Sequence, residues 1–215
     1  MFHVELSPDI MLYVCPLCGA EEIGDAFLCK DFFLTKEEFK IHHCQSCHVR
    51  FTNPQPQKTS IGKYYKSDEY VSHSDIRTGF VNKLYHRVRS LSVRKKYKLI
   101  AGYKPKGSLL DIGSGTGHLL SHFKQKGWAT KGIEPNENAR NYAIKNFRLD
   151  VEEENILSEI ENRSFDVVSM WHVLEHVHNP KMRMELVFNI LKDDGIAVVA
   201  LPNPGAYDAK YYREW

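Results

Sequence analysis

The feature that most constrains the fold is an alternation of strand-like and helix-like segments over the second half of the 215-residue chain. Short apolar runs bounded by turn residues indicate strands, which are expected at residues 108–113, 128–135, 149–156, 165–171 and 196–202. Helices are expected between them, at residues 118–127, 136–147 and 179–195. Strands that alternate with helices form a parallel sheet with right-handed crossovers. The sequence therefore predicts an α/β fold.

A glycine-rich loop follows the first of these strands. In LLDIGSGTGHLL, the residues Gly113, Gly115 and Gly117 are spaced G-x-G-x-G. Such a loop must turn sharply and bring the backbone close to a ligand, and side chains would obstruct both. The helix that begins after the loop offers free N–H groups and the positive end of its dipole. We therefore expect a nucleotide-like ligand at this loop.

The spacing of the loop differs from the dinucleotide fingerprint G-x-G-x-x-G. His118 stands where the third Gly of that fingerprint would be, and Asp111 precedes the first Gly by two residues. The stretch D-x-G-x-G-x-G resembles class I methyltransferases that use S-adenosylmethionine (SAM). The resemblance implies a Rossmann-like sheet, SAM as the cofactor, and a link from Asp111 to the methionine ammonium of SAM.

The next two strands are expected to hold the rest of the cofactor. The second strand ends in GIEP, where Glu134 could accept hydrogen bonds from both ribose hydroxyls. The family usually places an Asp after the third strand, and Asn155 of EENI is its counterpart here. Its amide oxygen can still accept a hydrogen bond from the adenine amino group. The expected cofactor-binding residues are Asp111, Gly113, Ser114, Gly115, Gly117, Glu134, Pro135, Asn155, Ile156 and Trp171.

The segment WHVLEH, residues 171–176, contains the pattern H-x-x-E-H, which is known from metallopeptidases. On a helix, His172, Glu175 and His176 would share one face. A peptidase would also need a long helix and a distant third protein ligand. It would leave the glycine loop and Glu134 without a purpose, so the peptidase interpretation is disfavoured.

The longer segment FDVVSMWHVLEHVHNP is similar to the fDvV…vLEHv.dP segment of SAM methyltransferases of the ubiquinone-biosynthesis type. The resemblance extends over the chain, because many such proteins begin with a zinc ribbon. It places His172 at the end of the fourth strand, where ligands of open α/β sheets bind. His172 is expected to face the methyl-transfer cavity as a general base. Alternatively, Glu175 and His176 hold a divalent ion, or His176 points toward the protein interior or the backbone and fixes the turn by a hydrogen bond.

All five cysteines lie within the first 47 residues. Two C-x-x-C pairs, CPLCG and CQSCH, can each offer two thiolates from one tight turn, and together they complete a tetrahedral zinc site. In a reducing compartment this pattern favours a metal over disulfides. A site closed by four thiolates has no open position and is expected to be structural. The expected zinc ligands are Cys15, Cys18, Cys44 and Cys47, with Cys29 outside the site.

A helix is expected between the cysteine module and the first strand of the sheet. Phe80, Leu84, Val88 and Leu91 recur every three or four residues and predict an apolar face. The rest of the helix is basic. Two interpretations remain open: a solvated face on a connecting helix, or a contact for an acidic partner or a phosphate-bearing substrate.

The chain divides into three expected segments: a zinc ribbon at residues 1–53, a linker with lid helices at 54–106, and a SAM-binding domain at 107–215. Tyr64, Tyr65 and Tyr70 resemble a lid segment of the family. They are expected either to close over the ligands or to pack the ribbon. The family's sheet has seven strands, so the sequence, which stops just past the fifth, is expected to lack the last ones.

The composition is that of a globular protein, with 42% hydrophobic and 26% charged residues. The net charge of +2 gives no global drive toward nucleic acid or an anionic membrane, so neither is expected as a partner. No apolar run approaches the roughly 20 residues that span a bilayer. The N-terminus lacks the pattern of a signal peptide, which predicts a cytoplasmic protein. The sequence indicates no particular oligomeric state.

The expected function is transfer of a methyl group from SAM to a small-molecule acceptor, by O-methylation. This in-line displacement on carbon needs positioning and deprotonation more than covalent catalysis. The alternative is a zinc-ribbon binding module whose SAM-type fold is a non-catalytic platform.

Overall fold

The structure of the protein is a computed structural model that describes residues 9–32, 34–61, 64, 80–207 and 211. The chain divides into two compact units. The first comprises Met1–Tyr70, Val177–Lys181 and Pro202–Trp215, and the second comprises Val71–His176 and Met182–Leu201.

The first unit contains a small antiparallel sheet. Its strands are β1 (Ile23–Lys30), β2 (Glu38–Cys44) and β3 (Arg50–Thr52), in the order β1-β2-β3. Cys15, Cys44 and Phe51 form its small buried core. So few buried residues give little hydrophobic stabilisation, and domains of this size usually depend on a metal or on disulfides.

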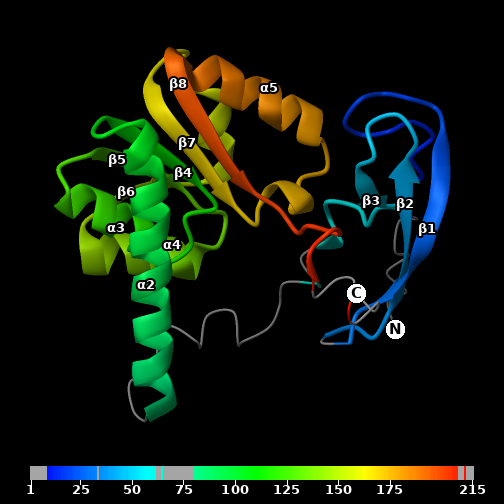
Figure 1. Ribbon diagram of the computed structural model, residues 1–215, viewed down its shortest axis with the longest axis horizontal. Coiled ribbons are helices and arrows are strands. Elements are labelled where there is room, and N and C mark those ends of the chain that lie inside the picture. The colour runs from blue at the N-terminus through cyan, green and yellow to red at the C-terminus, as the bar shows by residue number, and fades with distance from the viewer. Residues whose placement is uncertain (1–8, 33, 62–63, 65–79, 208–210, 212–215) are drawn as a thin grey trace, which may run out of the picture. The chain divides into compact units, whose positions relative to one another are not determined.

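The second unit contains a five-stranded parallel sheet (Figure 1). Its strands are β4 (Ser108–Ile112), β5 (Ala129–Ile133), β6 (Asp150–Glu152), β7 (Phe165–Trp171) and β8 (Leu191–Ala200). The order is β6-β5-β4-β7-β8, and all neighbouring pairs are parallel. The order reverses between β4 and β7, and in open α/β sheets ligands bind at this switch point. The predicted Rossmann-like sheet is therefore confirmed.

The helices are α2 (Phe80–Tyr103), α3 (His118–Gln125), α4 (Glu137–Phe147) and α5 (Pro180–Ile190), with the 3₁₀ turns η2 (Glu154–Ser158) and η3 (Leu174–His176). Two expected helix boundaries are confirmed, the start of α4 and the end of α3. The Asn136 side chain accepts a hydrogen bond from the amide of Ala139 and caps α4. Gly127 lies just past α3 with φ of 80°.

The core has two layers, one on each face of the parallel sheet. On one face, Leu109 and Val167 pack against α3, whose Phe123 is completely buried. On the other face, Leu110 and Val168 pack against α5. Adjacent strand residues point to opposite faces. Both faces are covered by helices, α2, α3 and α4 on one side and α5 on the other, so the central strands β4 and β7 bury apolar side chains on both faces (Figure 1).

The boundary between the last helix and the last strand differs from the prediction. The helix was expected to reach residue 195, but α5 ends at Ile190 and β8 begins at Leu191. Leu191 pairs with Phe165 at the start of β7, and a bulge follows this pair before the ladder continues. The sequence KDDG, residues 192–195, predicts a helix end, but it lies in the irregular stretch between the paired residues Leu191 and Ile196.

The apolar face predicted from the sequence of α2 is not the face that packs against the sheet. The side chains of Val88 and Leu91 are 57% and 56% exposed. Instead, Val93, Tyr97 and Ile100 pack against the core beside the sheet. Both sets have spacings of three or four residues, so periodicity cannot decide which one meets the sheet.

The segment after the ribbon is described only in part. The Tyr64 hydroxyl donates a 2.7 Å hydrogen bond to Glu37, and its ring lies edge-on to Phe39. Tyr64 therefore packs on the ribbon hairpin. Tyr65 and Tyr70 lie outside the described residues. Helix α2 belongs to the unit of the parallel sheet, and the expected boundaries 1–53, 54–106 and 107–215 stay a prediction.

No helix within the described ranges has both the length and the apolar character needed to cross a membrane.

Candidate cofactor site and zinc centre

The glycine loop has the sharp turn that its sequence predicts. Gly113, Gly115 and Gly117 all have positive φ, at 75°, 53° and 76°. The amides of Gly113 and Ser114 both donate to the carbonyl of Ile133 at the end of β5, at 2.7 and 3.0 Å. The loop is thus held across the carboxyl ends of two neighbouring strands.

The three glycines are needed for different reasons. A Cβ on Gly113 would lie 2.3 Å from Val173, and a Cβ on Gly117 would lie 2.6 Å from Leu149. Both contacts are too short, so these two glycines allow the loop to pack. A Cβ on Gly115 would meet no atom within 4 Å. Open space therefore lies above Gly115, where a ligand could approach the backbone.

Glu134 fixes the loop from the tip of β5. The residue is only 3% exposed. Its Oε2 accepts from the amide of Gly115 at 2.7 Å, and its Oε1 accepts from the amide of Asn136 at 2.9 Å. Burial raises the pKa of this carboxyl, and the two amides oppose that effect. Since a carboxylate has about four acceptor positions, each oxygen can still accept a further hydrogen bond.

Asp111 is a second buried carboxyl at the same site, also 3% exposed. Its Oδ1 accepts a 2.6 Å hydrogen bond from the Ser169 hydroxyl. The pKa of Asp111 is raised to about 7, chiefly by burial and to a smaller extent by the charge of Glu134, whereas the Ser169 hydrogen bond and the charge of Lys96 act to lower it. An unscreened buried carboxylate is costly, so the site favours a ligand that brings positive charge.

Lys96 reaches this site from α2. Its Nζ lies 4.1 Å from the ring centroid of Trp171, at the end of β7, and its charge acts on Asp111. Burial lowers the pKa of Lys96, while Asp111 opposes that effect. Sequence reasoning missed Lys96 and Ser169. Lys96 stands within a basic run, and no spacing rule distinguishes it from its neighbours.

Two polar atoms at the site are buried without a hydrogen-bond partner in the described part of the chain: Ser114 Oγ and Trp171 Nε1. Buried polar atoms are normally satisfied. Together with two buried carboxyls and open space at Gly115, they fit a polar, cationic ligand that carries hydroxyl groups. The residues present therefore fit SAM.

The remaining expected cofactor residues lie beside the loop. Pro135 follows Glu134 and is exposed, and Asn155 is exposed on η2. Ile156 is half-buried on the same turn. Their contacts to a cofactor stay predictions. Asn155 already uses its backbone carbonyl to accept from Ser158, which leaves its side chain available.

Arg140 is a further residue that sequence reasoning missed. From α4 it donates to the carbonyl of Glu134 at 2.8 Å and to the carboxylate of Glu153 at 2.9 Å. It therefore ties together the ends of β5 and β6, which carry the expected ribose and adenine contacts. A single Arg in a polar helix gives no sequence signal for this role.

The H-x-x-E-H residues do not share a helix face. His172 ends β7 with a left-handed φ of 58°, and Glu175 and His176 lie on the short turn η3. His172 Nδ1 is 3.4 Å from Glu175 Oε1, and the His172 side chain is 66% exposed. A non-glycine residue in this conformation is uncommon and often marks a functional position.

His176 is exposed, which argues against its pointing to the interior, while the alternative that it contacts the backbone and fixes the turn stays a prediction. Among the described residues, the cysteine cluster is the one group of three or more His, Cys, Asp or Glu side chains whose ligand atoms lie close enough for a metal. The divalent-metal interpretation of Glu175 and His176 therefore lacks a third protein ligand in the described ranges. The peptidase interpretation lacks its helix.

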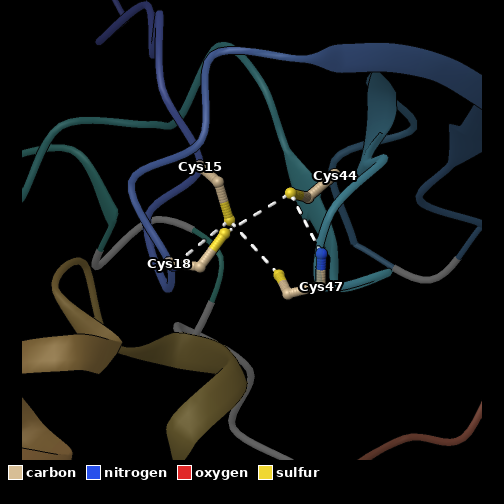
Figure 2. Close-up of side chains that lie close together, drawn as sticks. All are labelled: Cys15, Cys18, Cys44 and Cys47. Atoms are coloured by element: carbon tan, nitrogen blue, oxygen red, sulfur yellow. Dashed lines mark hydrogen bonds between the residues drawn. The ribbon is translucent and has the colours of Figure 1, made fainter.

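The four predicted cysteines converge on one point (Figure 2). All four sulfurs lie within 4.8 Å of one another, with 3.6 Å between Cys15 and Cys47 and 3.5 Å between Cys18 and Cys44. A disulfide needs about 2.05 Å. Tetrahedral zinc with Zn–S bonds of about 2.3 Å places its sulfurs about 3.8 Å apart. The cluster can therefore hold a zinc ion.

The two C-x-x-C turns have the same backbone pattern. Gly19 donates to the carbonyl of Cys15, and His48 donates to the carbonyl of Cys44, at 2.9 and 3.0 Å. Gly19 and His48 are both left-handed, with φ of 79° and 60°. In each turn a later amide also points at the first sulfur, from Cys18 to Cys15 and from Cys47 to Cys44. These N–H groups favour thiolates.

The histidines near the second turn are engaged elsewhere. His42 Nδ1 lies 3.2 Å from the Asp25 carboxylate, and its ring stacks on Phe51. The ring of His43 lies against Gly24. Cys29 lies on β1 and is not part of the sulfur cluster. The predicted set of four thiolates is thus the set that the structure brings together.

Comparison with known proteins gives the family. A family described as a methyltransferase domain matches residues 85–215, well over half of the chain. The chain belongs to this methyltransferase family. The matched region includes all of the expected cofactor residues and His172, whereas the cysteine module lies before it.

Curated relatives of this methyltransferase-family chain include a ubiquinone biosynthesis O-methyltransferase from Neisseria meningitidis serogroup C (strain 053442), 36% identical over 46% of each chain. Another protein of that name, from Rickettsia typhi, is 29% identical over 66% of this chain and 61% of its own length. The chain thus spans about half to three fifths of these relatives.

Among solved structures, a SAM-dependent methyltransferase from Archaeoglobus fulgidus is similar, with a TM-score of 0.51 and 21% identity, covering 65% of this chain and 61% of that one. At this identity the similarity shows the fold alone. Family and fold together support SAM as the cofactor of this methyltransferase-family chain.

Proposed function

We propose that this chain binds SAM at the carboxyl edge of its parallel sheet and transfers the methyl group to an oxygen of a small-molecule acceptor. One observation carries the proposal: Asp111 and Glu134 are buried carboxyls around the open glycine loop, and Asp111 forms no salt bridge with any of the described residues. The ammonium and sulfonium groups of SAM would supply the positive charge that this arrangement favours.

Each proposed contact uses an acceptor that the fold leaves available. Ionised Asp111 would bind the ammonium of SAM, and the free lone pairs of Glu134 would accept the ribose hydroxyls. The side chain of Asn155, with Ile156 beside it, would meet the adenine. Pro135 and Trp171 would flank the ligand, and Ser114 would provide a hydroxyl. SAM, when bound, supplies an electrophilic methyl group.

His172 is the proposed general base. It lies at the carboxyl end of β7, next to Trp171, and its imidazole is exposed. An acceptor hydroxyl must lose its proton as its oxygen attacks the methyl group. The Glu175 carboxylate, 3.4 Å from His172 Nδ1, would orient the ring and stabilise the imidazolium that forms. This leaves Nε2 of His172 to take the proton.

The choice of oxygen as the methyl acceptor rests on the relatives. Two of them are named as O-methyltransferases. A base such as His172 suits a hydroxyl group, whose proton must leave during transfer, better than an amine that attacks through its own lone pair. The zinc ribbon, closed by four thiolates, would have a structural role.

Calorimetry tests cofactor binding directly. SAM and S-adenosylhomocysteine should bind the purified chain, whereas NAD should not, because the loop lacks the dinucleotide spacing. Hydroxylated small molecules would then be screened for methylation with radiolabelled SAM. Absence of SAM binding would overturn the proposal. SAM binding without transfer to any acceptor, also in a longer form of the protein, would favour the non-catalytic platform.

A further inference from the structure

The charge of α2 differs sharply from that of the rest of the chain. Residues 80–103 contain four Lys and three Arg but no Asp or Glu, a formal charge of +7. The whole chain carries +2, so the remaining residues together carry 2 − 7 = −5. The near-neutral net charge therefore averages over a strongly basic helix and a mildly acidic remainder.

The outward face of α2 is apolar along its length. Tyr85, Val88, Leu91, Leu99 and Tyr103 are between 44% and 71% exposed. Their spacings of three, three, eight and four residues place them on one side of the helix. From Tyr85 to Tyr103 this stripe is about 27 Å long, at 1.5 Å per residue. A stripe of this length is unusual on a surface that faces only water.

The opposite side of α2 is already occupied. Val93 and Tyr97 pack against the core, and Ile100 is completely buried. The helix is therefore anchored to the sheet by one side and presents the apolar stripe on the other. The stripe is a feature of the folded surface and does not compete with the core contact.

Basic side chains border the stripe. Arg87, Arg94 and Lys98 are exposed on one flank, and Lys95 lies within the stripe. None of these four forms an ion pair with an acidic side chain among the described residues. On the other flank, Arg89 lies over the ring of Tyr85. The flanking cations are available for an external anionic surface.

We propose that the exposed face of α2 binds an anionic lipid surface, with the apolar stripe in the headgroup boundary and the flanking cations on lipid phosphates. A helix with this arrangement lies in the plane of the interface. Nucleic acid fits less well, because the tyrosines stand only at the two ends of the stripe, and Val88, Leu91 and Leu99 between them offer neither hydrogen bonds nor rings for stacking on bases. This inference is independent of the proposed methyl transfer.

The proposal accounts for both interpretations that the sequence left open for this helix. Its basic residues are solvated, and they also complement an acidic surface. The expectation of no membrane partner rested on the net charge, which does not describe the local charge of α2. Binding would be peripheral and would depend on salt, because exposed charges are screened beyond a Debye length of about 8 Å at 0.15 M ionic strength.

Vesicle flotation tests the proposal on the 215-residue chain. Vesicles of phosphatidylcholine with about 30% phosphatidylglycerol should bind the protein, and pure phosphatidylcholine should bind it at least tenfold more weakly. Raising the salt from 0.05 to about 0.5 M should release it. The variant L91S/K98E should bind the anionic vesicles at least tenfold more weakly, because it removes apolar area and reverses one charge.

The matched control is I144S/K145E on α4. Ile144 is 43% exposed and Lys145 is its exposed neighbour, so the same kinds of change are made outside α2. This control should bind vesicles as the wild type does. Circular dichroism and SAM binding would show that both variants are folded. Equal loss in both variants, or no wild-type binding at low salt, would overturn the proposal. So would concentration-dependent dimerisation that only L91S/K98E abolishes, since the stripe would then bind a second copy.

Discussion

Asp111 and Ser169 are direct register partners on the adjacent strands β4 and β7, where the strand order reverses. The Ser169 hydroxyl donates a 2.6 Å hydrogen bond to Oδ1 of Asp111, and both residues are buried. Sheet pairing thus places a hydrogen-bond donor on the carboxyl expected to meet SAM. Burial raises the pKa of Asp111 to about 7, and Ser169 opposes that rise.

Ser169→Ala should weaken SAM binding near pH 7 by about 1–3 kcal/mol, because a hydrogen bond to the ionised Asp111 is lost. The pKa of Asp111 would rise, so SAM affinity, which should increase from pH 5.5 to 7.5 in the wild type, would increase only at higher pH. Calorimetry across this range measures both effects. Ser121→Ala, which also removes a buried hydroxyl but on α3, should leave the pH profile unchanged.

The stability of the protein without SAM should also depend on pH, through the ionisation of Asp111. The pKa of Asp111 is raised from 3.8 to about 7. Its favourable contribution to the free energy of unfolding is therefore complete below pH 3.8 and is lost as the pH rises through 7. Because the ammonium of SAM would bind the ionised form of Asp111, SAM should raise the melting temperature more at pH 7.5 than at pH 5.5. Thermal unfolding with and without SAM measures this, and an equal shift at both pH values would contradict an ammonium contact at Asp111.

Lys96→Met should also make SAM binding at pH 7 weaker, by severalfold. The charge of Lys96 lowers the pKa of Asp111, so without it Asp111 stays protonated to higher pH. Lys98→Met is the matched control, since Lys98 is exposed on the same helix. Tighter binding in Lys96→Met would show instead that Lys96 competes with the ammonium of SAM for Asp111.

Glu134→Ala should weaken SAM binding by roughly 1–3 kcal/mol, through loss of charge-assisted hydrogen bonds to the ribose. It should also loosen the glycine loop, because the amide of Gly115 loses its acceptor. Glu152→Ala, at the end of the neighbouring strand β6, is the control and should bind SAM normally. Equal affinity in Glu134→Ala and the wild type would remove Glu134 from the site.

The purified, reduced protein should contain one zinc ion per chain. Cys44→Ser should lose most of this zinc and destabilise the ribbon, whose buried core is small. Cys29→Ser should retain it, because Cys29 is outside the sulfur cluster. Elemental analysis measures the metal content. A wild-type protein without zinc would refute a metal-held ribbon.

His172→Ala should lower turnover by about 10²–10⁴-fold and leave SAM affinity nearly unchanged, as expected for a general base. His172→Gly should be equally inactive but about 1 kcal/mol more stable than His172→Ala, because Gly adopts the left-handed backbone of this position at less cost. Steady-state kinetics with an acceptor from the screen and thermal unfolding measure these effects. Full turnover in His172→Ala would exclude the base.

His176→Ala should have a small effect on stability, within about 0.5 kcal/mol, since His176 is exposed. Loss of activity in His176→Ala that depends on added divalent metal would revive the metal interpretation of Glu175 and His176.

Local sequence signals determined much of the architecture. The central strands β4 and β7 are mostly apolar and bury side chains on both faces, which burial between two helix layers explains. Asn136 and Gly127 marked helix ends because capping and left-handed turns depend on local chemistry. The zinc ligands could be predicted because each C-x-x-C turn preforms half of a tetrahedral site.

Only the tertiary structure decided which groups share one environment. The periodicity of α2 fits two stripes, and contact with the sheet selected the one with Ile100. In the same way, strand register placed Ser169 beside Asp111, and the docking of α2 placed Lys96 over Trp171. The reason is physical: sequence patterns report local backbone preferences, whereas burial, charge coupling and the resulting pKa of Asp111 depend on residues far apart in the chain.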